Sequence, residues 1–452
     1  MCVFHNEVYL QMFYLLLESI YIYADLNETT DILLYTTTAF MEKIKSSHLY
    51  SDKIHFEIND AYTTIDLSCK ARLDLFELES ASRYGKILYL DTDILVKREL
   101  ARVFQLAEKD VLYTLAEGTI HDATDWWGKS LFGDEIDRYS DKVAFTSGII
   151  LCKNCTAVRE LFSNIRKDMS ERTHFFHDQP FIVYNAFKYH MYDNQTLKPY
   201  VVNNSLDILS DMTIHHFPGG LHSYERKLQQ MQMFLLQRKD YTISGHIDSA
   251  KQYINRYLLP IIRESGELLE GNIFMLHHTT TYTDRFLNKA KNISNMVLSS
   301  HILNVMEIGF NSGFSALLML LSNPHILLTC MDLGEHAYTY PCFQQLQSTF
   351  GDRIQIVLGD SMETLPEETR IYDVIHIDGG HSTPVAESDI MESYRLSRRG
   401  TVLIMDDYDF PNLHNLWDKH VRRYEFAPLD VFVYPSPHHD IKYVRSSYEF
   451  TD

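Results

Sequence analysis

Short apolar runs rich in β-branched residues alternate along this chain with longer segments whose apolar positions recur every three or four residues. Such alternation is typical of α/β folds with mostly parallel sheets, and here it occurs twice. The first series predicts a helix over residues 67–84 and strands at 31–36, 86–90, 111–114 and 147–151. The second series predicts strands at 304–308, 326–331, 354–358, 373–377 and 401–405.

The segment between the two series has no strong β-run and is rich in Leu, Gln, Arg, Lys and Glu. Its pattern predicts amphipathic helices at residues 223–237 and 250–269. A chain of 452 residues is long enough for two or three domains. We therefore expect two Rossmann-like α/β domains, joined by a helical connector, at residues 1–225, 292–452 and 226–291 respectively.

Composition narrows the possible partners and the compartment. Hydrophobic residues make up 45% and charged residues 23%, which is ordinary for a globular protein. The formal net charge of −20 disfavours a nucleic-acid partner, because phosphates require basic residues. The six cysteines form no disulfide framework, and Cys152 and Cys155 are interpreted as an incidental reduced pair. Polar residues interrupt the apolar stretch 9–23, and no secretory signal is visible, so we expect a soluble cytoplasmic protein without a membrane span.

Two carboxylates, Asp91 and Asp93, directly follow the apolar run 86–90. At a strand end, residues two apart can face the same side. Hard oxygen ligands suit Mg²⁺ or Mn²⁺, which can neutralise a diphosphate leaving group. The motif is short and also occurs in solvated turns, and Asp407 and Asp409 repeat it.

The order of the surrounding motifs gives this pair a context. The series comprises Arg72, Asp91 with Asp93, Thr146-Ser147-Gly148, His177-Asp178-Gln179 and His216-Phe217-Pro218-Gly219. In this order the motifs resemble the glycogenin-like and galactosyltransferase-like retaining glycosyltransferases of family 8, which have a GT-A fold. The resemblance covers roughly the first half of the chain.

This resemblance implies transfer of a sugar from a nucleotide-sugar, most often a UDP-sugar, to a glycan or glycoprotein acceptor. Asp91, Asp93 and His216 would bind Mn²⁺ or Mg²⁺ together with the donor. Arg72 would contact the nucleotide-sugar. The resemblance further implies that Asp178 and Gln179 are catalytic residues beside the sugar and the acceptor.

The chain departs from the family pattern at two positions. Thr146 stands where the family has Asn. His222 stands where the family has a Lys that holds the diphosphate, and Lys227 is a possible substitute for that Lys. Simpler interpretations also remain for single residues. His216 can be a hydrogen-bonded core histidine, and Asp178 can be a helix N-cap before Pro180.

The neighbouring Trp126 and Trp127 can either stack on a sugar ring or pack beneath a loop.

A glycine-containing turn opens the second α/β series. The run 305–313 reads as a strand, a turn and the start of a helix, with the pattern ExGxxxG rather than GxGxxG. Asp332 ends the next strand, where an acidic residue suits ribose hydroxyls. Asp360 and Ser361 end the one after and could contact an adenine ring. Over about residues 292–430 this arrangement resembles class I S-adenosylmethionine-dependent methyltransferases.

That resemblance implies that Glu307, Gly309, Asn311 and Gly313 line S-adenosylmethionine and that Asp332 binds its ribose. A plain α/β turn without a cofactor is the alternative.

Three carboxylates follow the last two parallel strands of this series. Asp378 ends one strand, and Asp406 and Asp407 end the next. Carboxylates packed at one sheet edge repel one another unless a cation or protons offset the charge, so we expect a divalent metal. Two unrelated, solvent-facing clusters are the alternative.

The pattern resembles metal-dependent O-methyltransferases, including catechol-type and macrolide-sugar enzymes. The resemblance implies Mg²⁺ at Asp378, Asp406 and Asp407. It also implies His381, three residues after the first Asp, as the general base for a sugar hydroxyl.

Taken together, the resemblances imply a bifunctional, glycan-building enzyme similar to those of giant DNA viruses. Such an enzyme would act in the host cytoplasm. One alternative is an O-methyltransferase with a non-catalytic, glycan-binding first domain. Another is a methyltransferase of small phenols with an unrelated partner domain. The sugar donor, the acceptor, the methylated position and the oligomeric state cannot be predicted from the sequence.

Overall fold

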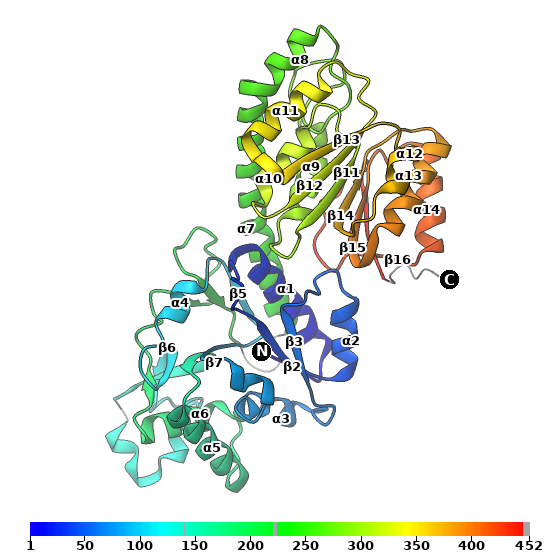
Figure 1. Cartoon of the computed structure of the whole chain (residues 1–452). Helices are drawn as coiled ribbons and strands as arrows, with labels where there is room; N and C mark the ends of the chain where they lie inside the picture. The colour runs from blue at the N-terminus through cyan, green and yellow to red at the C-terminus, as the bar shows by residue number, and fades with distance from the viewer. Residues whose placement is uncertain (140, 220–223, 446–452) are drawn as a thin grey trace. The chain divides into compact units, whose positions relative to one another are not determined.

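The computed structural model describes residues 1–139, 141–219 and 224–445. The chain divides into two compact units (Figure 1). One contains Met1–Ile44 and Ser51–Leu235, and the other contains Lys45–Tyr50 and Leu236–Asp452. The division therefore falls later than the expected boundary at residue 225, and a short loop of the first half belongs to the second unit.

The first unit has a divided α/β core. A parallel sheet has the order β1-β2-β3, a second sheet has the order β4-β7-β6-β8, and a small sheet has the order β5-β10-β9. The strands are β1 Cys2–Val3, β2 Ile32–Thr36, β3 Ile54–Ile58, β4 Lys86–Leu90, β5 Ile94–Val96, β6 Leu112–Thr119, β7 Val143–Lys153, β8 Tyr192–Asp193, β9 Val201–Asn203 and β10 Ile214–His216. A cavity lies between β2 and β4, lined among others by Leu33 and Ile87.

The helices of the first unit cover these sheets. They are α1 Glu7–Tyr23, α2 Thr38–Ser46, α3 Ile65–Ser68, α4 Ala101–Gln105, α5 Thr156–Glu171 and α6 Gln179–Lys188. The apolar stretch 9–23 lies within α1, where Phe13, Leu16 and Leu17 are fully buried. The apolar positions of this stretch are therefore buried against the rest of the first unit. No helix in the described parts of the chain is long and apolar enough to cross a membrane.

The prediction of one helix over residues 67–84 is wrong. The segment instead contains the end of α3, the 3₁₀ helix Ala71–Asp74 and the 3₁₀ helix Glu79–Arg83. Asp74 accepts hydrogen bonds from the hydroxyls of Tyr35 and Tyr62, and Arg72 is held by groups from other elements. These tertiary contacts favour short turns over a continuous helix.

The second unit is built on one seven-stranded sheet with the order β13-β12-β11-β14-β15-β17-β16. Its strands are β11 Asn304–Ile308, β12 Leu327–Asp332, β13 Ile354–Leu358, β14 Tyr372–Ile377, β15 Ser397–Met405, β16 Phe426–Pro428 and β17 Asp440–Val444. The pairings from β13 to β15 are parallel, and β17 is antiparallel to both neighbours. The carboxyl ends of the five predicted strands therefore lie at one edge of the sheet.

Helices flank both faces of this sheet, as Figure 1 shows for α10 and α11 on one side and α13 and α14 on the other. The helices of this unit are α8 Leu259–Ser265, α9 Leu287–Val297, α10 Phe314–Ser322, α11 Thr339–Phe350, α12 Ser361–Thr364, α13 Thr383–Arg395 and α14 Pro411–Arg423. The long helix α7, Tyr224–Tyr253, begins in the first unit and belongs to the second from Leu236 onward. The resulting three-layer α/β architecture is the one predicted for this part of the chain.

The predicted break between two connector helices is absent from the described part of this segment. α7 runs for 30 residues through Gly245 and continues into a π-helical turn, Ile254–Leu258. The buried positions Ile243, Ile247, Ala250 and Ile254 keep the spacing of a single helix face. This apolar face explains why the helix continues through the glycine.

Candidate functional site

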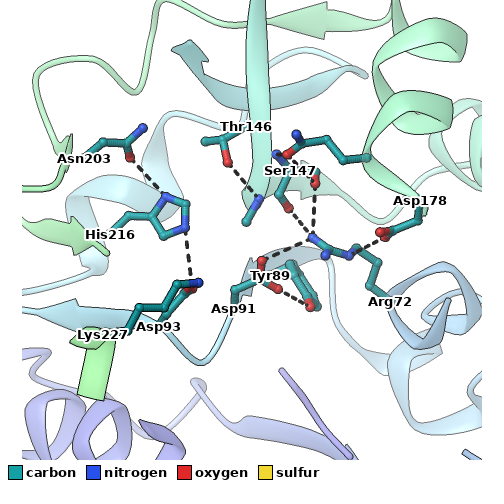
Figure 2. Close-up of polar contacts among 12 residues, drawn as sticks. Arg72, Tyr89, Asp91, Asp93, Thr146, Ser147, Asp178, Asn203, His216 and Lys227 are labelled. Atoms are coloured by element: carbon teal, nitrogen blue, oxygen red, sulfur yellow. Dashed lines mark hydrogen bonds and ion pairs between the residues drawn. The ribbon is translucent and has the colours of Figure 1, made fainter. Parts of the chain in front are cut away.

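Arg72 is the centre of a polar cluster in the first unit (Figure 2). Its Nη1 donates to the backbone oxygen of Ser147 at 2.6 Å and lies 3.5 Å from Oδ2 of Asp91. Its Nε lies 2.6 Å from Oδ2 of Asp178. The Tyr89 hydroxyl donates to Oδ1 of Asp91 at 2.7 Å. Burial alone would lower the pKa of Arg72, but Asp178 and Asp91 keep it well above the usual value.

Asp178 occupies the N-cap position of α6, but its side chain makes no capping hydrogen bond. Its carboxylate instead pairs with Arg72, and burial raises its pKa. The adjacent Gln179 accepts from the backbone nitrogen and the hydroxyl of Ser147, both at 3.2 Å. The structure thus brings Arg72, Asp91 and the adjacent pair Asp178 and Gln179 together from three separate parts of the chain.

Asp93 and His216 form the other half of this cluster (Figure 2). Pairing of β5 with β10 brings His216 opposite Ile94. Its Nε2 lies 3.5 Å from Oδ1 of Asp93, and its Nδ1 lies 3.0 Å from the amide oxygen of Asn203. Lys227 lies 2.7 Å from Oδ2 of Asp93. Burial would raise the pKa of Asp93, but the Lys227 ammonium and His216 hold it well below its usual range.

The residues around Gly148 can accommodate a cation. A Cβ atom at Gly148 would lie 2.9 Å from Nε2 of His216 and 3.0 Å from Oδ2 of Asp91. Oδ1 of Asp93 is buried and has no hydrogen-bond partner among the described residues. These acceptors suit Mn²⁺ or Mg²⁺, which Asp91, Asp93 and His216 would hold. The ligand atoms of these three residues do not, however, all lie within 4.8 Å of one another in the described structure.

The two departures from the family pattern have different outcomes. Thr146 lies at the predicted turn, and its hydroxyl accepts from the backbone nitrogen of Gly148 at 3.3 Å. His222 lies outside the described residues. Lys227, its possible substitute, points to Asp93 and therefore sits at the carboxylate pair itself.

The glycine turn of the second unit connects β11 to α10. Gly309 has a φ of +97°, and a Cβ atom there would lie 1.9 Å from the backbone oxygen of Asp378. Asp332, at the end of β12, accepts from the backbone nitrogen of Asn311 at 2.7 Å. Gly313 also has a positive φ, +74°, and Phe310 leaves no space for a side chain there. The turn therefore requires both glycines, and Asp332 fixes its backbone.

Two residues expected at the cofactor have other contacts. Glu307 is fully buried, and its Oε1 lies 3.1 Å from Nδ1 of His376. The carboxylate of Glu307 thus lies in the interior between the strands, and its expected place at the cofactor stays a prediction. Asp360 caps α12 by accepting from Met362, and Ser361 follows it at the sheet edge.

The three predicted carboxylates converge at the carboxyl ends of β14 and β15. Asp378, Asp406 and Asp407 each offer an oxygen within 4.8 Å of the others. Burial, followed by repulsion from Asp406, raises the pKa of Asp378 well above its usual value. A divalent cation would relieve this repulsion, so the donor set fits Mg²⁺.

The protein also places its own basic side chains at Asp406, which the sequence analysis missed; those of Lys289 and His376 are charged, whereas burial lowers the pKa of His439. Nζ of Lys289, from α9, lies 2.5 Å from Oδ2 of Asp406, and Nε2 of His376 lies 3.3 Å from the same oxygen. Nε2 of His439 lies 3.4 Å from Oδ1. Against the effect of burial, Lys289 holds the pKa of Asp406 well below its usual value. The His438-His439 pair before β17 was the only sequence signal for this contact.

His376 joins two buried carboxylates, those of Glu307 and Asp406. Burial opposes its protonation, but bonds to Asp406 and Glu307 raise its pKa to about 10. A buried chain of polar groups therefore links the strand before the glycine turn to the carboxylate group.

His381 lies at the open side of the carboxylate group. Its Nε2 is 2.8 Å from Oδ2 of Asp407, and its side chain is 45% exposed. The hydrogen bond to Asp407 raises the pKa of His381. The imidazole can therefore accept a proton from a group that approaches Asp378 and Asp407 from solvent.

Comparison with known proteins shows that part of the second unit is similar to methyltransferases. Residues 306–408 match the family model for a methyltransferase domain. No curated protein matches the chain. The second unit therefore contains a methyltransferase domain, for which S-adenosylmethionine is the expected cofactor.

Solved structures show weaker similarity. A StiE O-MT structure is 20% identical, with 28% of this chain and 46% of that chain covered and a TM-score of 0.24. Cofactor-bound Rv0187 from MTB is 18% identical, with 42% and 88% covered and a TM-score of 0.30. The TDP-rhamnose 3'-O-methyltransferase CalS11 is 17% identical, with 35% and 78% covered and a TM-score of 0.28. The chain spans about half the length of the StiE structures it matches.

Proposed function

We propose that the second unit transfers a methyl group from S-adenosylmethionine to a hydroxyl group, most specifically one on a sugar. The observation that carries this proposal is the grouping of Asp378, Asp406 and Asp407 beside the glycine turn. The match of residues 306–408 to a methyltransferase domain supports the reaction type.

Different residues would bind the cofactor, hold the metal and accept the proton in this reaction. Gly309, Asn311, Gly313 and Asp332 would hold the cofactor at the ends of β11 and β12, and Asp360 and Ser361 would lie beside its adenine.

Asp378, Asp406 and Asp407 would hold Mg²⁺, which lowers the pKa of a bound hydroxyl group. Nε2 of His381 would accept the hydroxyl proton, because this side chain is exposed beside Asp407.

The test is methyl transfer from isotope-labelled S-adenosylmethionine to a panel of sugars, nucleotide-sugars and catechols, with Mg²⁺ and with EDTA. Metal-dependent labelling of a sugar supports the proposal. Labelling of catechols but of no sugar favours the phenol alternative. Labelling that persists unchanged in EDTA contradicts the metal site.

We further propose that the first unit is a GT-A glycosyltransferase that uses a nucleotide-sugar. The contacts of Arg72 with Asp91, Asp178 and Ser147 support a site for an anionic donor. The unpartnered Oδ1 of Asp93, facing His216, supports the metal site. Asp178 and Gln179 would flank the transferred sugar and the acceptor. The acceptor class, the retaining outcome and the viral resemblance stay predictions.

Nucleotide release from a panel of UDP- and GDP-sugars, with Mn²⁺ and with EDTA, tests this second activity without a known acceptor. Metal-dependent release from one donor that is lost in Asp91→Asn supports the proposal. If no donor binds or turns over, the first unit is better explained as a non-catalytic, glycan-binding module.

A further inference from the structure

Three aromatic side chains form an exposed surface beside Gln179, which we call the aromatic ledge: Trp126, Phe175 and Phe176. The rings of Trp126 and Phe176 stack with centroids 4.0 Å apart, and Phe175 stands at 86° to Phe176. Phe175 is 77% exposed and Trp126 is 37% exposed. By contrast, Trp127 is buried against Gly118, so only the first of the two tryptophans is available to a ligand.

The aromatic ledge is rigidly held. His174 joins its two loops, because its Nδ1 accepts from the backbone nitrogen of Phe176 and its Nε2 lies 3.1 Å from Asp125. Asp125, directly before Trp126, and His177, directly after Phe176, have φ values of +62° and +54°. Left-handed backbone is uncommon at non-glycine residues and persists where surrounding contacts enforce it.

A direct contact connects the aromatic ledge to the Arg72 cluster. The amide nitrogen of Gln179 donates to the backbone oxygen of Trp126 at 3.3 Å. The amide oxygen of the same side chain accepts from Ser147, whose backbone oxygen accepts from Arg72. An acceptor molecule resting on Trp126 would therefore lie next to the residues proposed to hold the donor sugar.

We infer that the aromatic ledge binds a pyranose ring of a carbohydrate acceptor. A pyranose has an apolar C–H face that packs on an aromatic ring and a polar rim that needs hydrogen bonds. The ledge offers both, because the His177–Asp66 pair, 3.3 Å apart, lies next to the exposed rings. This inference rests on the proposed glycosyl transfer and specifies its acceptor class.

The experiment is a saturation-transfer NMR titration of the full chain with methyl glycosides of glucose, galactose, mannose and rhamnose. We expect one glycoside to bind with the strongest saturation on the protons of one ring face. Trp126→Ala and Phe175→Ala should each weaken its affinity about three- to tenfold, as expected for one aromatic contact. Tyr189→Ala, which removes another exposed ring in the same unit, should leave the affinity unchanged.

Phe175 is highly exposed, so Phe175→Ala should fold normally. This variant therefore tests the ledge even if Trp126→Ala fails to fold. Pyranoside binding that weakens in these variants supports the ledge even if no donor turns over, in which case only the glycosyl-transfer proposal fails. Donor turnover without pyranoside binding, or binding that both variants leave unchanged, overturns the ledge. Loss of self-association in Phe175→Ala, without any pyranoside binding, also overturns it.

Discussion

Nζ of Lys289 lies 2.5 Å from Oδ2 of Asp406, and both side chains are almost completely buried. The second unit thus carries a buried cation inside its carboxylate group. This charge offsets part of the repulsion among the three neighbouring carboxylates. It also leaves Asp378 as the member whose pKa is raised, and hence as the carboxylate that gains most from a metal ion.

Removing this internal cation should destabilise the second unit strongly. Lys289→Met leaves Asp406 buried without its main partner, so we expect a loss of about 3–5 kcal/mol in unfolding free energy. Urea unfolding followed by fluorescence of the buried Trp417, with Trp126 and Trp127 replaced by Phe, measures this loss.

Two further variants control this measurement. The double variant Lys289→Met/Asp406→Asn should recover most of the loss, because no unpaired charge remains buried. Lys419→Met removes an exposed ion pair with Glu387 and should cost less than about 1 kcal/mol. Equal effects of Lys289→Met and Lys419→Met would contradict the role given to Lys289.

Asp378→Asn should abolish methyl transfer and leave the affinity for S-adenosylmethionine nearly unchanged. The substitution removes a proposed metal ligand, whereas the residues expected at the cofactor lie at the ends of β11 and β12 and at the start of α12. Isothermal titration with the cofactor, alongside a methyl-transfer assay with and without EDTA, separates the two effects. Simultaneous loss of cofactor binding would make Asp378 a structural residue.

Gly148→Ala should eliminate metal-dependent donor turnover without unfolding the first unit. The added methyl group would occupy the space between His216 and Asp91, at 2.9 and 3.0 Å from their nearest atoms. Gly85→Ala is the matched control, because a Cβ atom there has nothing within 4 Å. Nucleotide release and thermal unfolding of both variants provide the comparison, and wild-type turnover in Gly148→Ala would contradict the site.

Acidification should destabilise the second unit through His48 and His301. Burial lowers their pKa values to about 3 and about 4, against about 6.5 when unfolded. Below pH 6.5 the unfolded chain therefore binds more protons than the folded one, and stability falls with falling pH until the folded pKa is reached. From pH 7 to pH 5 each histidine should cost about 2 kcal/mol.

Urea unfolding at these two pH values measures the loss. His301→Gln should reduce it by about 2 kcal/mol, since Gln does not titrate. An unchanged pH dependence in this variant would show that His301 is protonated in the folded state or does not control stability.

The strands could be predicted from sequence because each is a short, continuous apolar run, and this pattern can be recognised without knowing which elements pack against it. Residues 86–90, 304–308 and 354–358 are strands with the predicted bounds. The parallel order then placed Asp378, Asp406 and Asp407 at one edge.

The helical segments around residues 67–84 and 237–250 were predicted less well. Their structure depends on tertiary contacts of Arg72 and Asp74 and on a continuous buried face of α7. Local propensity carries neither kind of information.

The missed site residues share one property. Lys289 and His439 reach Asp406 from segments distant in sequence: Lys289 from α9, which precedes the sheet, and His439 from the residues just before β17. No spacing rule connects such residues, since only the packed sheet brings them together. Glu307 was assigned to the cofactor because it precedes the glycine turn, but its side chain points inward to His376.

The contact between Gly309 and the backbone oxygen of Asp378 has a consequence for how substrate preference can diversify. The loop expected to hold the methyl donor and the loop that starts the carboxylate group touch at a point with no space for even one methyl group. Neither loop can change its course without displacing the other. We therefore expect new acceptor preferences to arise at the periphery of the site, in segments such as 408–412 at the start of α14, while the contact between these two loops stays unchanged.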